Sequence, residues 1–391
     1  MTPTTHLYNA LDEYLRQCQD LWRDVRHIQS IGWMMLGMIQ SEKVHPSGFG
    51  VYVTSRAKKA QSKQRRFRRN LANRRINLAG VHQQLMRQAL SQWGLQRLYL
   101  SLDTTMLWNC FCLVWVGVVY RGRTIPIAFR VVPHKSSTIR LWYVQRVLRP
   151  VAATLPPSVE VVLLADRGFA DGKLLKYLQQ TLKWHFRIRI KKRFQFQTGD
   201  GRWHKISDIK LAAGEASFTG PVQLGKTTPY GPVYLAFAQD EPSGEFWMIV
   251  SDEPTNLSTF AQYRLRFQIE ENFLDLKSGG FQLEACRIRD PFALTQLLWV
   301  VALTMLFLVL QGTAVVAQGQ RQAVDPHWKR GMSYLKIGWN WIRLTITEQS
   351  QITLYRFLSS VADPEPAMAS RRQSEQSFQR EFTVLKHVPA S

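Results

Sequence analysis

The sequence predicts an α/β protein in which helical regions flank a central mixed sheet that carries a β-rich insertion. In several segments between residues 97 and 190, apolar residues alternate with period two or run continuously, as in strands, and segments with helical spacing separate them. From residue 194 to residue 250, short β-like runs are separated by glycine and proline. With 391 residues, 45% of them hydrophobic, the chain is long enough for two or three globular domains.

We expect three regions along the chain. They are a helical, basic region over residues 1–96, an α/β core over 97–320 with its insertion at about 194–255, and a helical region over 321–391 with a loosely ordered tail. The first region begins with helices, since Leu7, Leu11 and Leu15 recur at helical spacing and a second such run spans 31–39. The first residues lack the basic-then-apolar pattern of a signal peptide, so we expect a cytoplasmic protein.

A strongly basic segment covers residues 56–75, where ten of the twenty residues are Lys or Arg and none is acidic. Such a run is often a solvated surface. Phe67 and Leu71 interrupt it at i, i+4 spacing, which indicates a helix with one buried side. We expect this helix to contact nucleic acid. The candidate contact residues are Arg65, Arg66, Arg68 and Arg69.

The predicted core begins with three strands joined by short links, at residues 98–103, 110–120 and 124–132. A helix is expected at 137–148, closed by Pro150, and a continuously apolar strand at 159–165 suits a position buried on both faces. A helix at 173–182 and a strand at 184–190 follow. After the insertion, helices are expected at 259–277 and 292–316.

The segment 297–317 is apolar and about long enough to cross a bilayer. Its unbroken apolar part ends at Leu310, and a helix buried under a sheet is also apolar all round. We therefore favour a buried helix. The four cysteines form no CxxC pair, so reduced thiols are favoured over a zinc site. They are Cys18, Cys110, Cys112 and Cys286.

The charge of the chain indicates an anionic partner. Fifty-one Lys and Arg stand against 28 Asp and Glu, which gives a net charge of +23. Such a chain repels itself unless an anion compensates it. Nucleic acid is the first candidate and an anionic membrane surface is the second.

Three acidic residues stand at positions that simple solubility does not explain. Asp103 and Asp166 each follow an apolar strand, and open α/β sheets place their sites at the carboxyl ends of strands. Glu270 stands in a predicted helix. At about 100° per residue, one narrow stripe of this helix carries Glu270 between an Arg and a Lys. The alternatives for each acidic residue are a helix cap or a surface ion pair.

The residues of this stripe have the spacing Tyr-x2-Arg-x3-Glu-x6-Lys, formed by Tyr263, Arg266, Glu270 and Lys277. The spacing resembles the signature of the DDE transposases of insertion sequence family four, which includes the transposon-five transposase. The contexts LSLDTT and LLADRGFA resemble those of the first and second aspartates of that family. The resemblance covers about residues 97–316 and implies a ribonuclease-H-like core. The C-terminal part is shorter than in the transposon-five relative.

The resemblance implies an enzyme that cleaves DNA at transposon ends and transfers the cut strand into target DNA. Asp103, Asp166 and Glu270 would hold two Mg²⁺ ions, or Mn²⁺ as a substitute, because these ions prefer carboxylate oxygens. The DNA contacts that it implies are those of Tyr263, Arg266 and Lys277. The implied partners are double-stranded DNA, with its terminal inverted repeats and its target, and a second copy of the chain in a DNA-bound homodimer. A prokaryotic, DNA-associated protein with no membrane partner is expected.

One further residue is singled out by the resemblance. Residues 246–254, FWMIVSDEP, resemble the place where the family carries a tryptophan that holds a base outside the duplex, so Trp247 is a candidate DNA contact. The alternative is a core residue of a strand, since residues 246–250 are all apolar.

Two other functions share part of this pattern. A structure-specific nuclease with the same core would use the three carboxylates without the Tyr-Arg-Glu-Lys stripe. A basic DNA-binding protein without catalytic activity would need neither.

Overall fold

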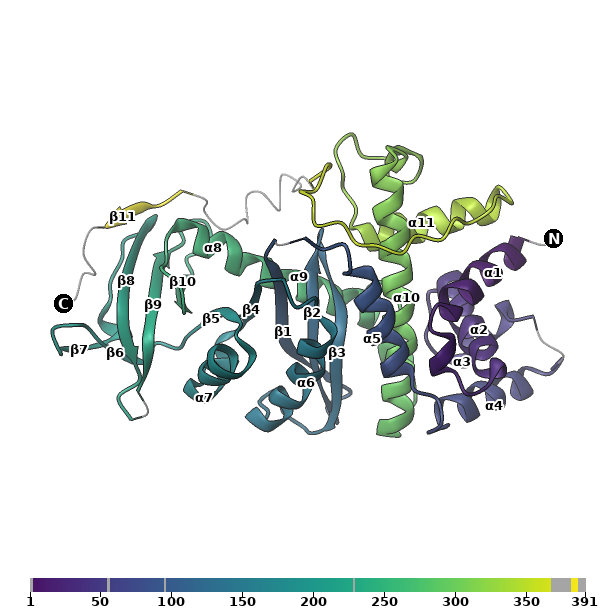
Figure 1. The fold of residues 1–391 in the computed structure, drawn as a ribbon, viewed down its shortest axis with the longest axis horizontal. Helices are drawn as coiled ribbons and strands as arrows, with labels where there is room; N and C mark the ends of the chain where they lie inside the picture. Colours follow the sequence, from purple (N-terminus) through teal and green to yellow (C-terminus); the bar gives the residue numbers. More distant parts are fainter. Residues whose placement is uncertain (1–2, 55–56, 95, 228, 367–380, 386–391) are drawn as a thin grey trace. The chain divides into compact units, whose positions relative to one another are not determined.

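The computed structural model describes residues 3–54, 57–94, 96–227, 229–366 and 381–385 (Figure 1). The chain divides into two compact units, each assembled from segments that are distant in the sequence. The first unit contains Met1–Gln96, Thr104–Val159 and Ile269–Met368. The second unit contains Arg97–Asp103, Glu160–Gln268 and Ala369–Ser391.

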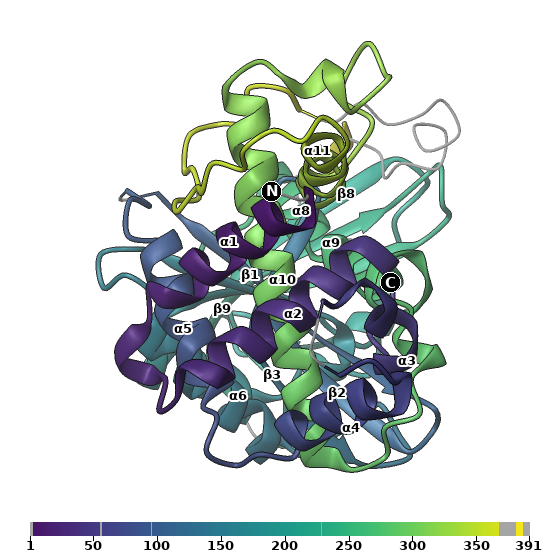
Figure 2. The same cartoon turned by 90° about the vertical axis from the view of Figure 1, so that its right-hand side faces the viewer.

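The N-terminal part of the first unit is helical, as predicted. Its helices are α1 (Pro3–Arg16), α2 (Val25–Ser41), α3 (Pro46–Phe49), α4 (Ala60–Leu71) and α5 (Leu78–Ala89). The basic segment forms α4, and its two apolar residues Phe67 and Leu71 are both buried. Figure 2 shows these helices beside the long helix α10 (Pro291–Ala317), against which α2, α4 and α5 pack.

Helix α10 is the centre of the first unit. Among the described residues it is the one helix that is long and apolar enough to cross a membrane, but 89% of its most apolar window is buried inside the protein. Strand β3 (Arg123–Pro133) and helix α11 (Tyr334–Thr347) also pack on it. The apolar sequence is therefore used as a core helix, as expected. Its N-cap is Asp290, whose carboxylate accepts from the backbone N–H of Ala293 at 2.7 Å.

The strands of the first unit form a hairpin with a tight turn. β2 (Phe111–Tyr120) and β3 (Arg123–Pro133) pair antiparallel, with Tyr120 opposite Arg123. The two residues between them, Arg121 and Gly122, have φ angles of 46° and 99°. Two consecutive positive φ angles are typical of the turn that matches the twist of a hairpin. The short link predicted from the sequence is confirmed.

The helix after β3 differs from the prediction. α6 spans Leu141–Thr154, so Pro150 lies inside it and does not end it. A proline removes one backbone donor, but the apolar face of the helix continues beyond it through the buried Val151. The hydroxyl of Thr154 also donates to the carbonyl of Pro150 at 2.8 Å. These contacts hold the helix together past the proline.

The second unit contains a mixed sheet with the strand order β1-β4-β5-β10-β9-β8-β6-β7. β1 (Leu98–Leu107), β4 (Val161–Ala165) and β5 (His185–Arg189) are parallel neighbours, and all five residues of β4 are buried. Helix α7 (Gly172–Lys176), extended by a π-helical turn through Leu182, connects β4 to β5. A parallel pair needs such a crossover.

The predicted β-rich insertion extends this sheet rather than forming a separate body. Its strands are β6 (Gln195–Gln197), β7 (Trp203–Lys205), β8 (Glu215–Leu224), β9 (Tyr230–Gln239) and β10 (Phe246–Ser251). β10 pairs antiparallel with both β5 and β9, so hydrogen bonding continues from the parallel strands into the insertion.

The helix predicted at 259–277 is broken into four pieces. They are α8 (Leu257–Arg264), the 3₁₀ turn η6 (Leu265–Phe267), α9 (Gln268–Leu274) and the π-helical turn η7 (Asp275–Gly279). A rotation of 100° per residue does not hold through 3₁₀ and π turns. The constant rotation from which the stripe of Tyr263, Arg266, Glu270 and Lys277 was predicted is therefore not kept over this segment.

The C-terminal tail contains a strand that the sequence did not predict. β11 (Thr383–Leu385) pairs parallel with β8, and the neighbouring Phe382 is buried in a cluster with Trp247 and Phe260. Most of the other residues that were expected to be loosely ordered, 367–380 and 386–391, lie outside the described residues.

Candidate active site

Two of the three predicted carboxylates come together in the second unit. In the parallel pair β1–β4, Leu102 lies opposite Ala165, so Asp103 and Asp166 follow paired residues on neighbouring strands. Asp166 comes directly after β4, but Asp103 does not end its strand, because β1 continues through Thr104 to Leu107. That detail of the prediction was wrong, since residues 104–107 continue the extended backbone.

Neither aspartate has the structural role that was its main alternative. Asp166 stands at the N-cap position of the short turn Arg167–Phe169, but its side chain makes no cap hydrogen bond. Asp103 is half-buried, and its carboxylate accepts from Nη1 of Arg266 at 3.1 Å. This ion pair is internal, because only 6% of the Arg266 side chain is exposed. It is not a surface ion pair of the ordinary kind.

Arg266 is held in place on three sides. The buried hydroxyl of Ser101, two residues before Asp103, donates to the backbone carbonyl of Arg266 at 3.3 Å. Its guanidinium lies over the ring of Phe267 at 4.5 Å and near that of Tyr263 at 5.9 Å. The 3₁₀ turn at residues 265–267 is thus fixed to β1. The sequence indicated Arg266 but not this contact, which depends on the break in the helix.

Tyr263 lies in the same buried environment. Its side chain is fully buried, and burial raises the pKa of its hydroxyl strongly. The positive charge of Arg266 lowers that pKa, whereas the negative charge of Asp166 raises it further. The net effect on the hydroxyl is a raised pKa. The phenol therefore stays protonated at neutral pH and can act as a hydrogen-bond donor.

Trp247 occupies a core position in β10. It is 2% exposed and is packed by Phe260 and Tyr263, with ring centroids 6.5 Å and 5.3 Å away. Its indole N–H donates to Glu245 at 3.0 Å. This placement matches the alternative of a core tryptophan. Stacking on an extruded base stays a prediction, and it would require the packing around the ring to open.

The other two residues of the predicted stripe belong to the first unit. Glu270 is an exposed residue of α9, four positions after Arg266. Lys277 lies in η7, and its Nζ is 3.9 Å from a carboxylate oxygen of Glu284. In the same turn, Asp275 is buried and pairs with Nε of Arg123 at 2.5 Å, so this part of the helix is anchored to β3.

A second charged cluster lies at the opposite ends of the parallel strands, and the sequence did not predict it. His185, Asp252 and Glu253 each offer a ligand atom within 4.8 Å of the others, as in a metal site. However, Glu253 already pairs with Arg187 at 2.6 Å and with Arg97 at 2.5 Å. Two cations beside the same carboxylate oppose the binding of a third, so we interpret the cluster as an ion-pair network. Burial raises the pKa of Glu253, but the two arginines outweigh it and hold that pKa below its usual value.

The network was missed because it depends on the register between strands. β5 carries His185 and Arg187, whereas Asp252 and Glu253 follow β10, which is more than sixty residues later. The only signal in the sequence was the presence of charged residues in a strand that is otherwise apolar.

The four arginines of the basic helix differ in exposure. Arg65, Arg68 and Arg69 are exposed on α4, as expected for residues that contact an external partner. Arg66 is half-buried, and its guanidinium donates to the hydroxyl of Ser30 at 3.2 Å. It therefore also ties α4 to α2.

Residues 114–307 match the family described as the transposase DDE domain. The matched range includes Asp166 and Glu270 and begins after Asp103. No curated protein matches the chain. Among solved structures, the chain is similar to the piggyBac transposase in a cryo-EM structure of its synaptic complex with hairpin DNA. The two have 10% sequence identity and a TM-score of 0.43, over 88% of this chain and 78% of that chain.

The structural resemblance is too distant to carry an argument about function. The family match rests on the sequence of the part of the chain that contains β4, the insertion and α9, including two of the three predicted carboxylates. This match to the transposase DDE domain supports a DDE transposase.

Proposed function

We propose that the chain cleaves DNA at the ends of a mobile element and joins those ends to target DNA. The observation that carries the proposal is the placement of Asp103 and Asp166 at neighbouring positions of two parallel strands. Glu270 is the third carboxylate, four residues after the arginine that contacts Asp103. The net charge of +23 favours double-stranded DNA as the partner. We also propose that the chain acts on DNA as a homodimer. Its catalytic core is proposed to be ribonuclease-H-like.

The donor set suits magnesium. Carboxylate oxygens are the ligands that Mg²⁺ prefers, and Mn²⁺ accepts the same ones. Asp103 and Asp166 are half-buried, and the Asp166 carboxylate is not used as a helix cap. Bound by Asp103, Asp166 and Glu270, two such ions would supply an activated nucleophile and a stabilised leaving oxygen.

Side chains of the protein orient the carboxylate of Asp103 and would orient the phosphodiester. Arg266 holds the carboxylate of Asp103, and Ser101 holds the backbone of Arg266. A guanidinium can grip a phosphate with two parallel hydrogen bonds, so Arg266 is suited to binding the phosphodiester next to Asp103. Tyr263 would keep its proton and donate a hydrogen bond to the same region. Lys277 would add a positive charge for the DNA backbone.

One assay tests the proposal against the other two functions. The purified protein is incubated with Mg²⁺ and a linear duplex that ends in the cognate inverted repeat. Joined products are expected from a transposase, whereas cleavage without joining indicates a nuclease and a shifted band alone indicates a binding protein. Omission of Mg²⁺ should stop cleavage and joining.

The variants Asp103→Asn, Asp166→Asn and Glu270→Gln should each lower cleavage and joining by about 10³-fold or more. End binding should stay within a few-fold of the wild type, because cations bind the DNA. Asp171→Asn is the matched control, since Asp171 is exposed and its carboxylate caps α7, a role that Asn fills equally well. Normal cleavage by Asp166→Asn protein would remove that residue from the site.

A further inference from the structure

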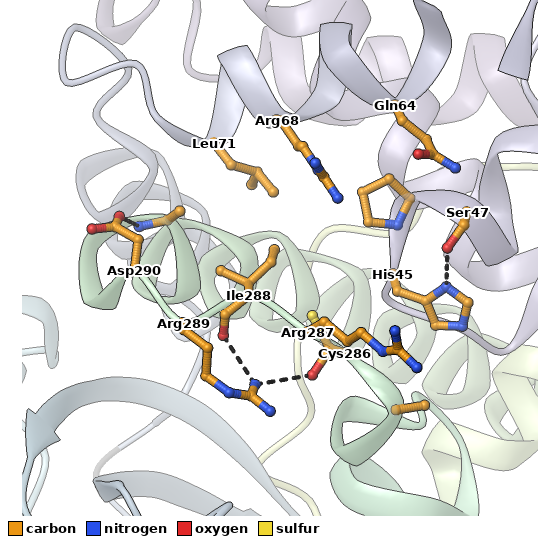
Figure 3. A pocket seen from close by; sticks show the side chains of 13 residues that line it. His45, Ser47, Gln64, Arg68, Leu71, Cys286, Arg287, Ile288, Arg289 and Asp290 are labelled. Carbon is orange, nitrogen blue, oxygen red and sulfur yellow. Dashed lines mark hydrogen bonds between the residues drawn. The ribbon is translucent and has the colours of Figure 1, made fainter. Parts of the chain in front are cut away.

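A second basic site lies within the first unit. A cavity of about 730 Å³ opens between α3 and α4 on one side and the segment before α10 on the other (Figure 3). Arg68 and Gln64 reach into it from α4, and His45 and Ser47 border it. The facing segment contributes residues 285–290, including Arg287 and Arg289.

The cavity is strongly positive. Arg68, Arg287 and Arg289 are all exposed, and among the described residues none of their guanidinium groups lies within 4 Å of a carboxylate. The one acidic residue of the lining is Asp290, and its carboxylate is used to cap α10. The guanidinium of Arg289 also donates to the backbone carbonyls of Cys286 and Ile288 (Figure 3). Arginines without an acidic partner in one cavity indicate an anionic ligand.

The two walls are fixed to each other. The backbone N–H of Val44, just before α3, donates to the carbonyl of Phe281 at 3.0 Å. The guanidinium of Arg74, just after α4, lies over the ring of Phe292 in α10 at 5.4 Å. The arginines are therefore carried by a preformed frame, and the cost of ordering it on binding is small.

The hollow continues along α4. A second cavity of about 280 Å³ shares Pro46, Ser47 and Gln64 with the first one and is also lined by Lys58 and Lys63. An elongated groove with cations along its length suits a polymer of phosphates better than a compact anion. The exposed Arg65 and Arg69 on the same helix extend the positive surface.

From this geometry we infer that the groove along α4 holds the sugar–phosphate backbone of duplex DNA. Arg68 contacts it from α4, and Arg287 contacts it from the segment after the Glu270 helix. The inference rests on the proposed function and adds a contact surface to it. Bound DNA thereby joins the basic helix to residues that stand in the chain between Glu270 and α10.

The experiment measures DNA affinity against salt concentration by fluorescence anisotropy, with a short labelled duplex. Arg68→Ala and Arg287→Ala should each reduce the log–log slope by about 0.9, the value for one lost phosphate contact. Arg149→Ala is the matched control, because Arg149 is exposed on α6 and lies outside the groove. Its slope should equal that of the wild type. Melting temperatures establish that each variant is folded.

Three results would overturn the inference. If both groove variants keep the wild-type slope, the groove does not hold DNA. If only Arg68→Ala changes it, the contact belongs to the basic helix alone. If the wild-type protein does not bind the duplex at all, the proposed function fails together with the inference, and this outcome is visible before any variant is made.

Discussion

His82 is a buried histidine in α5 that takes no part in the proposed chemistry. It is fully buried, and its ring lies 5.2 Å from that of Trp299. Among the described residues neither of its ring nitrogens has a hydrogen-bond partner. Burial lowers the pKa of His82 from 6.5 to about 3. The folded protein therefore keeps this side chain neutral where the unfolded chain protonates it.

The lowered pKa of His82 makes the folded protein less stable in acid. Below pH 6.5 the unfolded chain binds a proton that the folded protein does not bind, so acid favours unfolding. The free energy of unfolding should fall by about 1.4 kcal/mol for each pH unit below 6.5. In His82→Leu protein this contribution should vanish. Denaturant titrations between pH 7 and pH 5 measure it, and His134→Leu, on an exposed loop, is the control for loss of a histidine. Equal slopes in His82→Leu and wild-type protein would contradict the account.

At the residue scale, the sequence was most informative about site residues that directly follow a recognisable strand. Asp166 was predicted because it directly follows an apolar strand, and the structure places it there. The contact between Arg266 and Asp103 was not predictable, because it joins residues 163 positions apart through a turn that is not α-helical. Arg287 was missed because an isolated exposed arginine carries no signal until the facing wall of its cavity is known.

At the scale of elements, the crossing of α10 and α11 depends on two glycines. A Cβ atom on Gly312 would lie 2.0 Å from the backbone oxygen of Tyr334, and one on Gly338 would lie 1.8 Å from that of Leu308. Both obstacles are backbone atoms of the opposite helix. The helices must therefore move apart if either glycine gains a side chain.

Gly312→Ala and Gly338→Ala should each lower the free energy of unfolding by about 3 kcal/mol, the upper end of the range for an overpacked core. Thermal and denaturant unfolding measure this loss. Gly50→Ala is the control in the same unit, because nothing lies within 4 Å of its added Cβ and its φ is −61°. Full stability of Gly338→Ala protein would mean that the two helices do not pack as closely as described.

Elements with one strong periodic pattern were predicted well, and those shaped by tertiary contacts were not. The apolar run at 292–316 is α10, and the alternating segments around 98–132 are strands. The helix at 259–277 breaks because its middle turn is bonded to β1 and its end is anchored to Arg123. No local pattern encodes either contact. The strand at Thr383 likewise exists only because β8 offers it an edge.

At the scale of the whole molecule, the net charge of +23 makes two opposite salt effects expected. Salt screens the self-repulsion of the free protein, so its melting temperature should rise with ionic strength. Salt also competes for the phosphates, so DNA affinity should fall by about 10³-fold or more between about 50 mM and 200 mM salt if six or more phosphates are contacted. Differential scanning fluorimetry and anisotropy measure the two effects on the same samples. A DNA affinity that does not fall with salt would contradict a role for the charge in DNA binding, and a melting temperature that does not rise would contradict the self-repulsion.

The central claim, that Asp103, Asp166 and Glu270 hold the same metal ions, is tested most directly by iron-mediated cleavage of the protein. Fe²⁺ replaces Mg²⁺ at carboxylate sites, and with ascorbate and peroxide it generates hydroxyl radicals that cut the backbone close to the ion. We expect cuts at these three positions, and excess Mg²⁺ should suppress all three together. The cuts should be lost in Asp166→Asn protein. Cuts confined to the neighbourhood of His185, Asp252 and Glu253, or cuts that Mg²⁺ does not suppress, would contradict it.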